Sequence, residues 1–154
     1  MSHSLTSRKG CFYMLKIKEE YPPNIDKIRN ELATDADTLF CYFPYLYAPF
    51  LKNREIPKDL LIHEEVHAER QEEYTSPEIW WYRYLYDQEF RLEEELEAYT
   101  AQYSWVKKLV NAKAAKQCLE EVSEHLASNL YNLGITKYQA ETLIRKHEKR
   151  NKSI

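Results

Sequence analysis

Two histidines stand four residues apart in the stretch DLLIHEEVHAERQ, residues 59–71, and a glutamate directly follows the first of them. On a helix, residues four apart share one face, so His63 and His67 would bring two imidazoles to one point in space. This is the spacing with which a single helix supplies two ligands to a zinc ion. Glu64 lies about 100° further round the helix. It is therefore placed to hold a metal-bound water as a general base, not to bind the metal itself.

A catalytic zinc site needs a third protein ligand and keeps its fourth position open. No third histidine follows closely, and the next candidates are the four glutamates of the stretch RLEEELEAY. The apolar residues of a helix over 88–110 define its buried stripe. On that helical wheel Glu95 lies about 60° from the centre of the stripe and Glu93 about 100°. Glu94 and Glu97 lie farther away, so Glu95 is the predicted third ligand and the other three glutamates are predicted to be on the surface.

The elements that must hold these residues are predicted to be mainly helices. Only two glycines occur in the chain, which disfavours a turn-rich β-sandwich or barrel. Asp87 can cap the helix that carries the four glutamates. Thr136 with Gln139 forms a capping box for the last helix, and Gly134 stops the helix before it. Helices are predicted over residues 22–32, 58–73, 76–86, 88–110, 112–132 and 136–149.

Strands are predicted only ahead of the histidine helix. The stretch MLKIKEEY, residues 14–21, alternates well enough for a short strand. The aromatic stretch TLFCYFPYLYAPFL, residues 38–51, favours strands, but Pro44 and Pro49 interrupt it. Proline removes a donor from a sheet's ladder, so this stretch is predicted to be an edge strand or an irregular hairpin.

Length and composition fit one domain. With 154 residues and 44% apolar residues, the chain can bury a core of its own. We expect a flexible leader over residues 1–13 and a single α+β, mainly α, domain over residues 14–154. The formal net charge of −3 argues against a dedicated nucleic-acid binder, which usually carries a basic excess.

Three widely spaced cysteines, Cys11, Cys41 and Cys118, form neither a metal-binding pair nor a disulfide framework. They favour a reducing, intracellular setting. No apolar run reaches the length of a membrane span, and the apolar segment near the N-terminus lacks the cleavage site of a signal peptide. We therefore expect no membrane partner and no secretion.

The string HEEVH, followed about thirty residues later by ELEA, resembles the motif of the gluzincin zinc metallopeptidases. The resemblance implies one Zn²⁺ ion per chain, held by His63, His67 and Glu95, with Glu64 as the general base. One departure occurs at Tyr99, where several gluzincin families have an acidic residue. The groups that orient a ligand histidine are therefore left open.

A closer resemblance covers most of the chain from Met14 onward. The order of hairpin, histidine helix, WWYRYLYDQEFRLEEELEAYTAQ and the late LASNLYNLGITKYQAETLI is similar to that of small, mostly phage-encoded proteins regarded as zinc metallopeptidases. It implies a minimal zincin-like domain with a short N-terminal sheet and five to six helices. It also implies a protein or peptide substrate and, for a phage-encoded chain, a place in the host cytoplasm.

The remaining parts of a peptidase site stay open at this point. Gluzincins usually bind substrate along an edge strand, and either TLFCYF or YLYAPF fits that role. Tyr99, Tyr103 and Arg91 lie near the third ligand in sequence and are candidates for binding substrate or its oxyanion. Two other functions compete with hydrolysis. The chain could be a zinc-bearing binding module with narrow or no proteolytic activity, or a metal-free helical interaction protein in which the motif is accidental.

Overall fold

The computed structural model describes residues 15–51 and 55–152, where it contains six helices and three short strands. The elements are β1 (Lys16–Lys18), α2 (Ile25–Glu31), β2 (Phe40–Tyr42), β3 (Tyr45–Tyr47), α3 (Lys58–Glu72), α4 (Pro77–Tyr86), α5 (Gln88–Leu109), α6 (Ala112–Leu126) and α7 (Lys137–Lys152). The prediction of a mainly helical α+β chain is confirmed. The predicted leader over residues 1–13 lies outside the described residues.

The small sheet has the strand order β1-β3-β2. The central strand β3 pairs in parallel with β1 and antiparallel with β2, with Leu46 opposite both Ile17 and Cys41. The aromatic stretch therefore forms the predicted hairpin, with Pro44 in its turn. Because β3 is paired on both sides, YLYAPF is not an edge that can accept another strand. Of the two predicted candidates, only the segment that contains β2 lies at the edge of the sheet.

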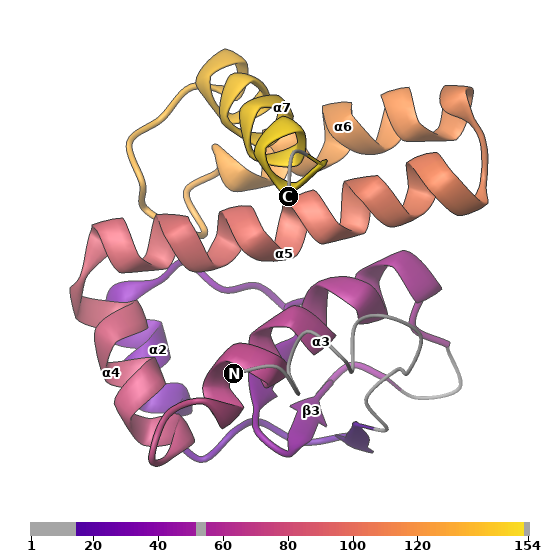
Figure 1. Cartoon of the computed structure of the whole chain (residues 1–154). Coiled ribbons are helices and arrows are strands. Elements are labelled where there is room, and N and C mark those ends of the chain that lie inside the picture. Colours follow the sequence, from indigo (N-terminus) through magenta and orange to yellow (C-terminus); the bar gives the residue numbers. More distant parts are fainter. Residues whose placement is uncertain (1–14, 52–54, 153–154) are drawn as a thin grey trace.

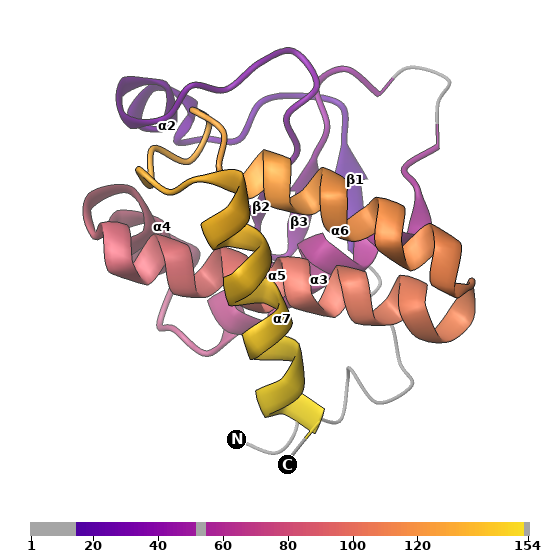
Figure 2. The same ribbon diagram turned by 90° about the horizontal axis from the view of Figure 1, so that it is seen from above.

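Helix α5 is the central element of the fold (Figure 1). It packs against α3 on one side and against α6 and α7 on the other. Figure 2, seen from above, shows α6 running beside α5 and α7 crossing both helices. Helix α3 in turn contacts β2, so α3 lies between the sheet and α5. No helix in residues 15–51 or 55–152 is both long and apolar enough to cross a membrane.

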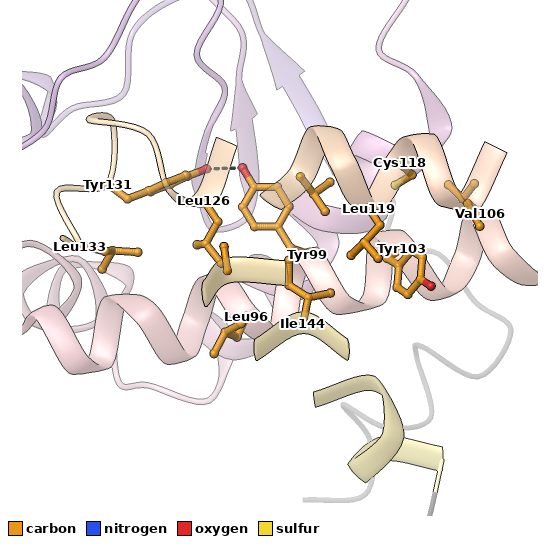
Figure 3. Packing of buried hydrophobic residues seen from close by; sticks show 13 residues of the cluster. Leu96, Tyr99, Tyr103, Val106, Cys118, Leu119, Leu126, Tyr131, Leu133 and Ile144 are labelled. Carbon is orange, nitrogen blue, oxygen red and sulfur yellow. Dashed lines mark hydrogen bonds between the residues drawn. The ribbon is translucent and has the colours of Figure 1, made fainter. Parts of the chain in front are cut away.

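Two apolar clusters hold this arrangement. The larger joins α5, α6, α7 and the segment between α6 and α7 (Figure 3), and Leu96, Leu126 and Ile144 are buried in it. The second joins α2, the sheet and α4 through the buried side chains of Ile28 and Trp80.

The helix signals in the sequence are confirmed at several ends. The side chain of Asp87 accepts a hydrogen bond from the Phe90 amide at 3.1 Å, as expected of an N-cap. Thr136 and Gln139 form the capping box, because each side chain accepts from the other residue's amide, at 3.1 and 2.9 Å. Side-chain caps thus mark the starts of α5 and α7, whereas α2, α3 and α4 begin without a side-chain cap hydrogen bond. The helix predicted over residues 22–32 begins only at Ile25, after its two prolines.

The predicted end of the helix over 112–132 is wrong. Helix α6 ends at Leu126, and turns follow it. Asn132 has a φ of 51° and Gly134 a φ of 67°, so the backbone is left-handed at two positions of this segment. Apolar residues continue beyond Leu126 as if the helix went on, because Leu133 and its neighbours in the loop still pack into the larger cluster.

Candidate metal centre

Three predicted ligands converge between α3 and α5. The Nε2 atoms of His63 and His67 lie 3.2 Å apart. Glu95 places one carboxylate oxygen 3.2 Å from the Nε2 of His63 and the other 3.0 Å from the Nε2 of His67. All three side chains are buried, and together they form a cluster that could hold a metal ion.

The spacing of these atoms suits a tetrahedral ion. A metal with bonds of 2.0–2.1 Å to nitrogen and oxygen has ligand atoms about 3.3–3.4 Å apart, close to the observed separations of 3.0–3.2 Å. Within the described residues the Oε1 of Glu95 is buried and, apart from its 3.2 Å contact with the Nε2 of His63, has no hydrogen-bond partner. A buried carboxylate oxygen of this kind is normally satisfied, so the donor set and its orphaned oxygen both fit a cation.

Aromatic rings, not carboxylates, orient the two histidines. The ring of Tyr99 packs against that of His63 with centroids 4.2 Å apart, and Trp80 packs against His67 at 5.5 Å. The Nδ1 atoms of both histidines are buried and have no hydrogen-bond partner among the described residues. Ligand histidines usually donate this N–H to a carboxylate or carbonyl. The position where gluzincin families have an acidic residue thus carries a ring that fixes the imidazole by contact.

Tyr84 is a functional residue that sequence reasoning missed. Its hydroxyl donates a hydrogen bond to Glu95 at 2.6 Å and so fixes the direction of the carboxylate. Burial, and then the nearby charge of Glu95, raise the pKa of this hydroxyl well above its ordinary value, so Tyr84 stays a donor. The only signal in the sequence was its place one turn after Trp80 on an aromatic helix.

The charges of the cluster are strongly coupled. Burial alone would lower the pKa of His67, but the adjacent Glu95 outweighs it and raises that pKa to about 9. Burial would raise the pKa of Glu95, whereas His67 and His63 bring it well below its ordinary range. Each group thus favours the charged form of the other, and a metal ion bound by these residues would displace a proton from the imidazole.

Glu64 lies beside the cluster without belonging to it. Its Oε2 is 4.0 Å from the Nε2 of His63, too far to share a ligand position. Burial raises the pKa of Glu64, and the neighbouring histidines only partly offset that effect. A carboxylate with a raised pKa is better matched to taking up and returning a proton near neutral pH.

A cavity of about 50 Å³ opens beside these groups. Glu64 and all three metal-binding candidates line it, together with β2 and the segment before it. Its other walls include Trp80, Trp81, Tyr84 and Tyr131. Both tryptophans are buried, and they also form walls of the candidate site.

The three predicted substrate-binding residues have different surroundings. Arg91 is buried and donates to the backbone carbonyls of Tyr84 at 2.6 Å and Tyr131 at 2.7 Å. Tyr103 lies in the larger apolar cluster, and neither residue lines the cavity. Tyr99 reaches the site through its ring, while its hydroxyl meets that of Tyr131 at 2.6 Å (Figure 3).

Tyr131 is the second residue that the sequence did not single out. It projects from the segment between α6 and α7 and lines the cavity. Arg91 holds its backbone carbonyl, and Gln88 donates to the next carbonyl, that of Asn132, at 2.7 Å. Nothing in its local sequence distinguishes it, because α5 and the loop after α6 meet only in the folded chain.

The prediction that Glu94 lies on a solvated surface is wrong. Glu94 is 1% exposed and accepts hydrogen bonds from Arg70 at 2.7 Å and from the Trp80 indole at 2.8 Å. The helical wheel assumed one buried stripe, whereas α5 is covered by α3 on one side and by α6 and α7 on the other. Glu94 thus ties together three helices directly behind the metal-binding candidates.

Two other polar residues, Glu69 and His147, are also buried. Glu69 lies on α3, which is packed between β2 and α5. His147 on α7 contacts the carboxylate of Glu97 at 2.8 Å. Glu93 is exposed as predicted.

Comparison of the chain with protein-family models, with curated proteins and with solved structures gives no match. The functional interpretation therefore rests on the residues of the site.

Proposed function

We propose that the chain is a zinc-dependent peptidase of the gluzincin type. The observation that carries this proposal is the convergence of His63, His67 and Glu95 within 3.0–3.2 Å beside a cavity that Glu64 also lines. Three ligands with an open side are typical of catalytic zinc, whereas structural zinc is enclosed by four. Two imidazoles and a carboxylate also accept cobalt or iron, so elemental analysis must identify the ion.

The reaction assigned to this site is hydrolysis of a peptide bond. A zinc ion held by the three ligands would acidify a water molecule and polarise the carbonyl of the substrate. Glu64 would take the proton of that water and return it to the leaving amine. Its position beside the ligands, and the rise of its pKa on burial, both support this role.

Other residues would orient the substrate. Tyr131 is our candidate for donating a hydrogen bond to the polarised carbonyl oxygen, because it lines the cavity and Tyr99 and Arg91 hold it in place. An extended substrate would run beside the β2 edge. Gln71 and Trp81 already donate hydrogen bonds to the Cys41 carbonyl, at 2.7 and 3.0 Å. Backbone hydrogen bonds from an extended substrate would therefore form at the start of β2.

The decisive experiment replaces Glu64 with glutamine. Glu64→Gln should keep one zinc ion per chain but lose hydrolysis by at least about hundredfold, the low end of a general base's contribution. Glu93→Gln, an exposed residue on α5, is the matched control and should retain both properties. Cleavage of a defined peptide mixture is followed by mass spectrometry, with metal content measured on the same samples. Hydrolysis by Glu64→Gln at the wild-type rate would refute the assignment.

A narrower function is favoured by one observation, the small volume of the cavity. About 50 Å³ is far below the volume of typical ligand pockets, so only some substrates would reach the metal. In that case the chain is a zinc-bearing binding module that cleaves one protein or none. Cleavage of many unrelated peptides in the same mixture would eliminate this alternative.

A further inference from the structure

A second cavity, of about 220 Å³, lies where α2, α4 and β2 meet. It is larger than the cavity at the candidate metal centre, and the two share Trp81 as a wall. Figure 1 shows α2 and α4 side by side, and the two helices are in contact. Its lining consists of Asn24, Lys27, Tyr42, Glu78, Trp81, Tyr82, Leu85 and Tyr86.

Aromatic residues make up half of this lining. Tyr82 and Tyr86, one turn apart on α4, have ring centroids 5.0 Å apart and are 67% and 53% exposed. Tyrosine and tryptophan are enriched where proteins recognise partners, because they bury a large area with few rotatable bonds. Two exposed tyrosines at the rim of an aromatic cavity therefore favour an aromatic ligand, which can pack edge-to-face against them.

Asn24 lines this cavity and carries a hydrogen-bond acceptor that lacks a partner. Its Oδ1 is buried and has no partner among the described residues. Asn24 precedes α2, but its side chain caps no backbone amide of that helix. A buried acceptor left without a donor is costly, so a donor from a bound molecule would satisfy it.

The charges of the lining favour a neutral ligand. Lys27 and Glu78 both line the cavity, and their charges are opposite. Burial, and then the charge of Glu78, raise the pKa of the Tyr42 hydroxyl. The lining thus carries no net charge and offers polar groups among aromatic walls. A neutral aromatic side chain with a donor at its tip matches this chemistry.

The second cavity also lies next to the candidate metal centre along β2. Cys41 lines the first cavity and Tyr42, the next residue of the strand, lines the second. The indole of Trp81 donates to the Cys41 carbonyl at 3.0 Å, so the shared wall is fixed to this strand. An extended chain lying beside β2 at the metal centre would therefore pass the second cavity within a few residues.

From these observations we propose that the second cavity is a specificity subsite for a tyrosine or tryptophan side chain of a peptide substrate. The donor at the tip of that side chain bonds Asn24, and the tyrosines of α4 enclose its ring. This inference rests on the proposed peptidase function of the metal centre. It defines the substrate class as peptides with a hydroxyl- or N–H-bearing aromatic residue at one fixed position near the cleaved bond.

The test compares matched peptides that carry tyrosine or phenylalanine at each position around a cleavage site. The zinc-loaded wild-type protein should cleave the tyrosine peptide about tenfold faster in kcat/KM at one position, the value of about one net hydrogen bond. Asn24→Ala should abolish that ratio by slowing cleavage of the tyrosine peptide to the rate of the phenylalanine peptide. Tyr86→Ala should raise KM for both peptides. Tyr138→Ala, which removes a tyrosine that is 79% exposed on α7, should behave like wild type.

The results separate this proposal from the peptidase proposal. Cleavage without any tyrosine preference, or a preference that Asn24→Ala leaves intact, overturns the subsite while the peptidase stands. If no peptide is cleaved, the peptidase proposal fails, and the subsite is then tested by peptide binding alone. The blocked tripeptides Ala-Tyr-Ala and Ala-Phe-Ala are then titrated into the protein, and their binding is followed by tryptophan fluorescence because Trp81 lines the cavity. Tighter binding of the tyrosine peptide that Asn24→Ala abolishes supports the subsite, and equal or absent binding overturns it.

Discussion

Removing or adding zinc should change the thermal stability of this chain by a measurable amount. The three candidate ligands already place their donor atoms 3.0–3.2 Å apart in the fold. The unfolded chain does not hold Glu95 near the histidines. Zinc would therefore bind the folded state in preference to the unfolded state and stabilise it by mass action.

The size of the effect follows from that linkage. With free zinc at about 1,000 times its dissociation constant, the free energy of unfolding should rise by roughly 4 kcal/mol. For a chain of this length each kcal/mol shifts the melting temperature by about 2–4 °C. We therefore expect the melting temperature to be roughly 8–16 °C higher in zinc than in a chelator.

Two neighbouring buried glutamates provide the matched variants. Glu95→Gln removes a ligand charge and should abolish the difference between zinc and chelator. Glu94→Gln leaves the ligands intact but deprives Arg70 of its carboxylate. It should lower stability by about 2–3 kcal/mol in both conditions while keeping the zinc-dependent shift.

Differential scanning calorimetry of the three proteins, each in chelator and in zinc, measures these quantities. A wild-type melting temperature that zinc leaves unchanged would refute the assignment of a metal centre. An equal zinc-dependent shift in Glu95→Gln would refute Glu95 as the third ligand. A zinc-dependent shift lost only in Glu94→Gln would mean that the two neighbours have been assigned the wrong roles.

Two further predictions concern the residues around the ligands. Tyr84→Phe removes the 2.6 Å hydrogen bond to Glu95 and should weaken zinc binding about 10–100-fold with little change in the fold. Competition with a chromogenic chelator measures this affinity. An unchanged affinity would show that aromatic packing alone orients the carboxylate. Gln71→Ala removes the bonds to the Phe43 amide and the Cys41 carbonyl and should lower the unfolding free energy by about 1–3 kcal/mol in urea titrations. A loss below about 0.5 kcal/mol would show that the Trp81 bond to Cys41 suffices to hold the hairpin.

The sequence predicted the ligands because their information is local. His63 and His67 are one helical turn apart, and Glu95 is distinguished from Glu93 by its angle on a single helix. Helix caps such as Asp87 are equally local, because the side chain bonds an amide three residues away. In each case the periodicity of one helix was enough, and the placement of that helix in the fold did not matter.

What the sequence did not reveal depends on several elements at once. Tyr84 and Tyr131 reach the site from α4 and from the loop after α6, and no spacing links them to the ligands. Glu94 was expected in solvent because a helical wheel describes one partner, whereas α5 has partners on opposite sides. A wheel therefore fails where a helix is central to the fold.

The burial of the cluster weighs against a metal-free interaction protein. Such a protein would stabilise this region better with apolar side chains, because buried ion pairs seldom repay the loss of their hydration. Here a carboxylate oxygen of Glu95 is buried and, apart from its contact with the Nε2 of His63, has no hydrogen-bond partner among the described residues. A solely structural polar cluster would be expected to satisfy this oxygen. The Nε2 atoms and the Glu95 carboxylate instead face one another at the spacing that a small cation needs, so metal binding accounts for an arrangement that stability alone does not.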